Sequence, residues 1–138
     1  MAFMSCSDKG NDVYLKNSSY SECTTGENKT KAQEEGTAYV TISAINKKTL
    51  KIDMYHVLLN CGLKKIESDI NYNGKTIIIS FTPIGNDTNC LCERQLTYEI
   101  GNLQEGQSYD CIIIQENMEY ASFKFDFTGD LTKKINLN

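Results

Sequence analysis

Residues 86–114 read NDTNCLCERQLTYEIGNLQEGQSYDCIII, and this stretch decides the fold. Polar and apolar side chains alternate in its first half, around Leu96 and Tyr98. They alternate again in its second half, around Cys111 and Ile113. Strict alternation of this kind is typical of a half-buried β-strand. The stretch therefore predicts two strands joined by a turn.

The turn between these strands has the spacing Leu103-x-x-Gly106-x-x-Tyr109. This spacing resembles the corner between strands E and F of immunoglobulin-like and fibronectin type III domains. In that corner a tyrosine hydroxyl bonds back to the backbone of the turn. We expect Tyr109 to be such a corner tyrosine.

The same period of two recurs along the chain. Alternating runs occupy residues 37–44, 50–61, 66–72, 77–81 and 121–127, and Gly, Asn or Asp bounds each run. Within 50–61 the phase of the alternation shifts near Tyr55 and His56, which predicts a β-bulge or a bend there. Asn73-Gly74 predicts a hairpin, because this pair tolerates positive φ at both turn positions.

No segment has a convincing period of 3.6 residues, so we predict an all-β chain. The expected fold is an immunoglobulin-like or fibronectin type III-like β-sandwich of seven to eight strands. Residues 37–138 are expected to form the sandwich and residues 7–36 a polar N-terminal arm, with one short strand at 12–16. Residues 1–6 look like the remnant of a lipoprotein signal.

The charge of the chain argues against nucleic-acid binding, and its hydropathy argues against a transmembrane helix. The formal net charge is −4 at pH 7, and the lysines are scattered rather than gathered in a basic stripe. Nucleic acid is therefore not an expected ligand. The sequence has no run of about 18 apolar residues, so it predicts no transmembrane helix. Any membrane contact is expected to be made through a lipid anchor alone.

The start of the chain carries the expected anchor. Phe3, Met4, Ser5 and Cys6 resemble a bacterial lipobox, in which a small residue precedes the cysteine that receives the lipid. A polar tether-like run follows at residues 7–12. Cys6 would then be the lipidated N-terminus of a cell-envelope protein, on the outer membrane or the cell surface.

Six cysteines in 138 residues favour an oxidising compartment, where disulfides persist. Lipidation of Cys6 leaves five cysteines, which form at most two disulfides and leave one free thiol. Strand parity places Cys61, Cys90 and Cys92 on inward-facing positions. We expect Cys61 to bond to Cys90 or Cys92, and Cys23 to bond to the other. Cys111 would remain as a buried free thiol.

A zinc site made by His56, Cys61, Cys90 and Cys92 is the competing interpretation. Zinc ligands are usually paired two to four residues apart, and Cys90-x-Cys92 is tighter than that. His56 is also out of phase with Cys61. A redox role lacks the CxxC-helix context that lowers the pKa of a thiol. We therefore expect disulfides and neither a metal nor a cofactor.

No catalytic motif emerges, so we do not expect an enzyme. His56 is the only histidine, and no nucleophile is identifiable beside it. Six carboxylates fall on the polar faces of predicted strands: Asp53, Glu67, Asp69, Glu99, Asp110 and Asp126. Two of them facing each other across a cleft would form a glycosidase pair, which sequence alone does not show.

Five segments together resemble a group of uncharacterised Bacteroides-type secreted lipoproteins. They are Met4-Ser5-Cys6, SSYSEC at 18–23, LKIDMYHVLLNCG at 50–62, NGKTIIIS at 73–80, and CLCERQLTYEIGNLQEGQSYDCIII at 90–114. Gly62 and Arg94 stand where the family pattern has further cysteines. These two losses are consistent with one missing disulfide, which favours disulfides over zinc. The resemblance implies a surface or periplasm-facing location and brings no activity.

The expected function is non-enzymatic: a binding or accessory module of the cell envelope, with a glycan or protein ligand. Exposed tyrosines would present the binding face, and the candidates are Tyr14, Tyr20, Tyr39, Tyr55 and Tyr120. An inhibitor-type protein that docks on an enzyme through the loop 82–90 is the first alternative. An enzyme is the second. A flat aromatic face would favour glycan binding, a protruding loop would favour an inhibitor, and a deep pocket would favour an enzyme.

Overall fold

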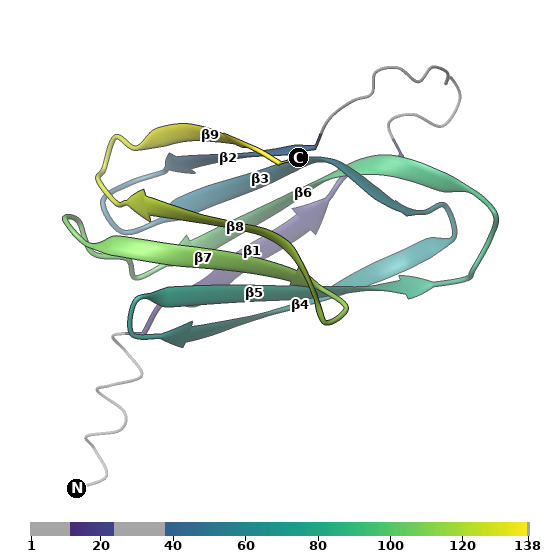
Figure 1. The fold of residues 1–138 in the computed structure, drawn as a ribbon, viewed down its shortest axis with the longest axis horizontal. Helices are drawn as coiled ribbons and strands as arrows, with labels where there is room; N and C mark the ends of the chain where they lie inside the picture. The colour runs from purple at the N-terminus through teal and green to yellow at the C-terminus, as the bar shows by residue number, and fades with distance from the viewer. Residues whose placement is uncertain (1–11, 24–37, 138) are drawn as a thin grey trace, which may run out of the picture.

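The computed structural model describes residues 12–23 and 38–137. Over these ranges the chain forms nine strands and no helix, in two sheets packed face to face (Figure 1). The predicted β-sandwich is confirmed. The strands are β1 (Tyr14–Tyr20), β2 (Tyr39–Ala44), β3 (Leu50–Asn60), β4 (Leu63–Asn73), β5 (Thr76–Gly85), β6 (Leu91–Gly101), β7 (Ser108–Gln115), β8 (Met118–Asp126) and β9 (Thr132–Asn136).

The two sheets enclose one hydrophobic core. The five-stranded sheet has the order β1-β6-β3-β2-β9, and the four-stranded sheet has the order β4-β5-β7-β8. Alternate residues of the central strands point into the space between the sheets, as the period of two predicts. Among those fully removed from water are Val40, Ile42, Ile52, Met54, Ile77, Ile79, Phe81 and Ile113. Each such side chain contributes about 1.5–3 kcal/mol of hydrophobic stabilisation.

Part of the segment 7–36, which was expected to be a polar arm with a short strand at 12–16, belongs to the five-stranded sheet. β1 lies inside this segment and pairs with β6 from Tyr14 opposite Gly101 to Tyr20 opposite Leu96. Its burial pattern is almost wholly exposed, so the alternation that marks a half-buried strand is absent from its sequence. Backbone hydrogen bonds to β6 hold this edge strand in place. Residues 1–11 and 24–37 lie outside the described residues, and Cys6 is among them.

The second edge strand of the same sheet, β9, was not predicted. It pairs with β2, and Lys134 lies opposite Thr41. The strand has four exposed positions and a lysine pair, so it resembles a solvated tail in sequence. β1 and β9 are both edge strands, where one side of the backbone and most side chains face water.

The immunoglobulin-like subtype stays a prediction. An immunoglobulin sandwich consists of two antiparallel sheets. Here β5 and β7 are parallel, from Thr76 opposite Asp110 to Phe81 opposite Gln115. The other strand pairs are antiparallel.

The hairpin predicted at Asn73-Gly74 joins β4 to β5. Asn73 is the last residue of β4 and pairs with Thr76, so the two turn residues are Gly74 and Lys75. Only Gly74 has a positive φ, at 69°. The predicted turn is therefore displaced by one residue, and it needs the left-handed conformation at its first position alone. Glycine meets this need without a steric cost.

Candidate functional site

Two tyrosines and the single histidine gather on the outer face of the five-stranded sheet. Tyr39 of β2 lies opposite Tyr55 of β3, and the two rings stack with centroids 4.5 Å apart and planes 13° apart. The imidazole of His56 lies 5.8 Å from the Tyr39 ring at a tilt of 57°. All three side chains remain partly exposed. We call Tyr39, Tyr55 and His56 the aromatic cluster.

A β-bulge places Tyr55 and His56 on the same face. Met54 and Val57 are both fully buried, so two consecutive residues between them point outward. The register of β3 against β6 shifts between Met54 and Val57, and His56 has a φ of 63°. The predicted bulge is confirmed. The left-handed conformation costs a non-glycine residue about 1–2 kcal/mol, and such strain is often found at functional sites.

Two charged side chains from other strands complete the cluster. Glu93 of β6 lies with Oε1 3.0 Å from Nδ1 of His56, and the Glu93 side chain is only 17% exposed. This contact holds the imidazole ring in place. Lys134 of β9 lies with Nζ 4.4 Å from the centroid of the Tyr39 ring, a cation–π contact. Neither residue was singled out from the sequence.

A row of polar side chains extends from the cluster along β3 and β6. Asp53 accepts hydrogen bonds from Thr97 Oγ1 at 2.6 Å and from Gln95 Nε2 at 3.3 Å. Lys51 Nζ lies 3.8 Å from the other carboxylate oxygen of Asp53. These groups form a continuous strip of hydrogen-bond donors and acceptors beside the aromatic rings.

The six carboxylates considered for catalysis are divided between the two sheets. Asp53 and Glu99 belong to strands of the five-stranded sheet, and Glu67, Asp69, Asp110 and Asp126 belong to the four-stranded sheet. Polar positions of a sandwich face away from the core, so the carboxylates of one sheet point away from those of the other. A glycosidase pair made across the two sheets is therefore excluded.

The other three candidate tyrosines do not join the cluster. Tyr14 is 50% exposed on β1, at the opposite edge of the sheet from β2 and β9. Tyr20 closes the gap between the sheets, where its hydroxyl donates to the Lys64 carbonyl at 3.2 Å. Tyr120 packs on the core, and burial raises the pKa of its hydroxyl.

The two disulfides lie at the end of the sandwich where β6 begins. Cys23 bonds to Cys92, and Cys61 bonds to Cys90. The sequence left open whether Cys61 bonds to Cys90 or to Cys92, and in the structure its partner is Cys90. Cys111 is the buried free thiol, as expected. Cys92 is 1% exposed, as its parity predicts.

The inward orientation predicted for Cys90 is wrong. Cys90 is exposed because it precedes the first residue of β6, and the alternation of a strand does not extend to it. Its bridge to Cys61 is part of a small network at the turn between β3 and β4. There Asn60 Oδ1 accepts a hydrogen bond from Thr88 Oγ1 at 2.8 Å, and Asn60 Nδ2 donates to the Thr88 carbonyl.

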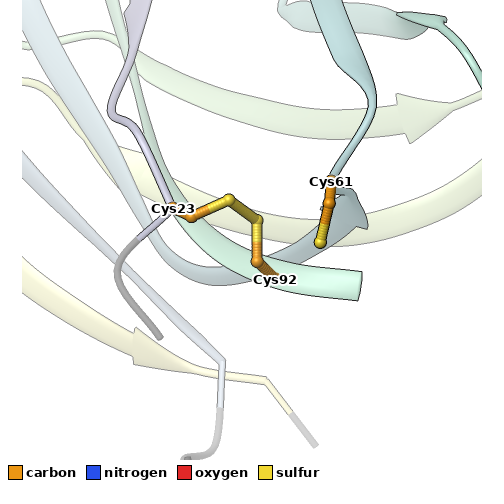
Figure 2. Close-up of side chains that lie close together, drawn as sticks. All are labelled: Cys23, Cys61 and Cys92. Carbon is orange, nitrogen blue, oxygen red and sulfur yellow. A yellow bond between two sulfur atoms is a disulfide. The ribbon is translucent and has the colours of Figure 1, made fainter. Parts of the chain in front are cut away.

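The zinc set that included His56 is not assembled. His56 lies on the outer face with Glu93, whereas Cys92 is buried between the sheets. Three sulfurs do converge among the described residues: those of Cys23, Cys61 and Cys92 lie within 4.8 Å of one another. In Figure 2 the sulfur of Cys61 lies beside the Cys23–Cys92 bridge. All three sulfurs are engaged in disulfides.

The tyrosine corner predicted at Tyr109 is present. The Tyr109 hydroxyl accepts a hydrogen bond from the backbone N–H of Gln104 at 3.0 Å. Leu103 and Tyr109 are buried, and Gly106 has a φ of 89°. The corner lies at the opposite end of β6 from the disulfides, so it is a structural feature and not part of the aromatic cluster.

The loop considered for an inhibitor is held close to the body of the protein. Residues 82–85 complete β5, and Asn60 and the Cys61–Cys90 bridge hold the remainder. Beside it is a hollow of about 250 Å³, whose lining includes Leu58, Pro83, Ile84 and Leu91. Leu58 and Leu91 are 55% and 63% exposed.

The comparisons with known proteins add no family. In the described part of the chain, no helix is long and apolar enough to cross a membrane. No family model matches the sequence, and no curated protein or solved structure is significantly similar to this chain.

Proposed function

We propose that this chain is a non-enzymatic binding module of the cell envelope, anchored by a lipid on Cys6, and that its ligand is a glycan. The observation that supports the proposal is the aromatic cluster on the outer face of the five-stranded sheet. Two stacked tyrosines and an imidazole there combine apolar ring surface with polar tips.

A sugar needs this combination, because its C–H faces are apolar and its hydroxyls form hydrogen bonds. The strip that follows the cluster offers the carboxylate of Asp53, the amide of Gln95 and the hydroxyl of Thr97. Lys134 and Glu93 add one charge of each sign beside the rings. Sites for small ligands are usually concave pockets. An open sheet face is better suited to an extended polymer, so we infer an oligosaccharide or polysaccharide ligand.

The bulge at Tyr55–His56 supports the same proposal. A regular strand would turn one of these two side chains into the core. The fold instead keeps His56 in a left-handed conformation, which places a third ring beside the tyrosine pair. Bulges that redirect a side chain are common next to functional sites.

The test is a glycan-binding measurement with matched tyrosine variants. The soluble domain is screened against immobilised polysaccharides, and affinity for the best one is measured by calorimetry. Tyr39→Ala and Tyr55→Ala are each expected to weaken binding at least tenfold, as for a ring at the centre of an interface. Tyr14→Ala removes an exposed tyrosine from the far edge of the same sheet and should leave binding unchanged.

Two results would contradict the proposal. One is a screen in which no polysaccharide binds the folded protein. The other is a bound polysaccharide whose affinity is the same for Tyr39→Ala, Tyr55→Ala and the unaltered chain. The second result would move the site away from the aromatic cluster.

A protein ligand at the disulfide end is the second candidate, because exposed Leu58 and Leu91 flank the hollow there. An exposed apolar pair beside a hollow is typical of a protein contact. Leu58→Asp and Leu91→Asp would abolish binding to such a partner and leave glycan binding unchanged, so the two candidates separate.

A further inference from the structure

We propose that the two disulfides form a thiol–disulfide exchange relay, in which reduction of the exposed Cys61–Cys90 bridge opens the Cys23–Cys92 bridge through the sulfur of Cys61. The reductant is a dithiol, either a small molecule or a dithiol oxidoreductase. The inference is independent of the ligand of the aromatic cluster.

A dithiol can reach one sulfur of each bridge, because Cys90 and Cys23 are both exposed. Exchange begins with attack of a thiolate on a sulfur that it can reach. Attack on Cys23 would expel Cys92, which is 1% exposed and is therefore a poorer leaving group than the partly exposed Cys61. The external dithiol therefore attacks Cys90, and Cys61 leaves as the thiolate.

The sulfur that this step releases lies close to the second bridge. Cys61 Sγ lies within 4.8 Å of both Cys23 Sγ and Cys92 Sγ (Figure 2). A thiolate at Cys61 is therefore next to a second disulfide from the moment it forms. The next attack is intramolecular, and held proximity accelerates such a step strongly.

A buried guanidinium lies near the residues of the second bridge. Arg94 lies two residues from Cys92 on the same face of β6, and its side chain is among the buried charged groups, at 8% exposure. One guanidinium nitrogen donates to the Ser21 carbonyl at 3.0 Å, and Ser21 is two residues from Cys23. Nε of Arg94 is buried with no hydrogen-bond partner in the described part of the chain. A neighbouring guanidinium favours the thiolate form of a cysteine, and so favours exchange here.

The exchange step has one favoured direction. Cys23 is less buried than Cys92. Burial raises the pKa of a thiol and makes it a poorer leaving group. Cys61 therefore attacks Cys92, the Cys61–Cys92 bond forms, and Cys23 leaves as the thiolate and takes up a proton from water.

The overall reaction balances. The external dithiol forms a mixed disulfide with Cys90, and its second thiol then releases Cys90 and closes a disulfide. One dithiol is oxidised to a disulfide, and the protein gains two electrons and two protons. It keeps one bridge, Cys61–Cys92, and carries thiols at Cys23 and Cys90. The end of β1 is then no longer linked covalently to β6, and hydrogen bonds hold it, among them the backbone pairs with β6 and the bond from Arg94 to the Ser21 carbonyl.

The test is a partial reduction followed by peptide mapping. The folded protein is treated with one equivalent of dithiothreitol, quenched in acid, alkylated with N-ethylmaleimide and digested. Cys90 and Cys92 fall in one tryptic peptide, residues 76–94, so fragment spectra must separate them. Cys111 is buried, and it should stay unlabelled until the protein is denatured. It therefore reports that exchange took place in the folded state.

The expected product has labels on Cys23 and Cys90 and an intact Cys61–Cys92 bridge. Labels on Cys61 and Cys90 with Cys23–Cys92 intact would overturn the relay. Labels on Cys23 and Cys92 with Cys61–Cys90 intact would also overturn it, because the dithiol would have reached the second bridge directly.

A second measurement uses Cys90→Ser, which leaves Cys61 unpaired beside the second bridge. Prepared without reductant at pH 8, this variant should form Cys61–Cys92 and expose an alkylatable Cys23. Quantitative labelling of Cys61 with Cys23–Cys92 intact would contradict the proposal. Cys61→Ser is the matched control. It leaves the unpaired thiol on Cys90 and removes the sulfur that attacks the second bridge, so Cys23 should not be labelled.

Discussion

The backbone conformation of His56 determines which side chains reach the outer face of the sheet at the aromatic cluster. Its φ of 63° lets two consecutive side chains point to the outer face while Met54 and Val57 stay buried on either side. Contacts with Tyr39 and Glu93 stabilise this strained conformation. The phase shift in the sequence indicated where the alternation breaks. It did not indicate which residue would take the left-handed conformation, because that depends on the contacts across the sheet.

Cys111 is expected to be chemically inert in the folded protein. Burial raises the pKa of its thiol from 9.0 to about 12. The thiolate is the nucleophile, so native protein at pH 8 should show no iodoacetamide label on Cys111, and full labelling in denaturant. Between pH 9 and about 12 the unfolded chain loses this proton before the folded chain does. The free energy of unfolding should therefore fall as pH rises through that window.

Cys111→Ala provides the control for the pH dependence. Burial also raises the pKa of Tyr98, which a hydrogen bond to Ser68 partly lowers, and the pKa of Tyr120. These groups contribute to alkaline destabilisation in both proteins, so the slopes are compared by urea unfolding at pH 8, 9 and 10. A slope identical in both proteins, or a native label on Cys111, would contradict the assignment.

At the scale of an element, the turn between β7 and β8 is strained in a way that substitution can relieve. Gln115 pairs with Met118, so Glu116 and Asn117 form a two-residue turn. Both have positive φ, at 49° and 72°. This is the type I′ pattern, which favours Asn-Gly. Glu116→Asn with Asn117→Gly should raise the free energy of unfolding by about 1 kcal/mol, measured by urea unfolding.

Asn117→Ala is the matched test of the same argument. Alanine tolerates the left-handed conformation less well than asparagine, so this variant should be less stable than the unaltered chain. A lower free energy of unfolding for the Asn-Gly variant, or a higher one for Asn117→Ala, would contradict the claim that backbone strain at this turn destabilises the protein.

The strands with a buried face were predictable from the sequence, and the exposed edge strands were predictable only in part. β3 and β6 alternate along most of their length because every second side chain enters the core. β1 and β9 have no fully buried positions, so β1 was expected only as a short strand at 12–16 and β9 was not predicted. The inward orientation predicted for Cys90 was wrong because Cys90 lies just before β6, where the alternation of the strand does not apply. The turn at Glu116–Asn117 lacks the glycine by which such turns are usually recognised.

At the scale of the whole molecule, the site depends on the order of the strands. The aromatic cluster and its two charged neighbours come from four adjacent strands of one sheet, β2, β3, β6 and β9. β2 and β3 follow each other in the chain, whereas β6 and β9 come much later. Alternation shows which face of its own strand a residue takes, but it does not show which distant strands are neighbours. Tyr39 and Tyr55 were therefore predictable as exposed tyrosines, and the contacts of the cluster with Glu93 and Lys134 were not.

The two ends of the sandwich are stabilised differently. The corner of Tyr109 stabilises one end with a single hydrogen bond to the backbone, and two disulfides stabilise the other. The aromatic cluster lies between them on the outer face of β2 and β3. A change at the disulfide end should therefore alter global stability without removing any ring of the cluster.

The two disulfides should contribute unequally to stability. Their cysteines are 69 and 29 residues apart for Cys23–Cys92 and Cys61–Cys90 respectively. Loop-closure entropy then gives about 4.4 kcal/mol for the longer loop and about 3.6 kcal/mol for the shorter one. Burial of Cys92 adds to the difference, because its truncation also removes core contacts. Cys23→Ala with Cys92→Ala should therefore lower the free energy of unfolding more than Cys61→Ala with Cys90→Ala does. Guanidinium unfolding of the two double variants measures the difference. A larger loss of unfolding free energy on removing Cys61–Cys90 would contradict the prediction. It would show that local contacts at the β3–β4 turn outweigh the entropy of the longer loop.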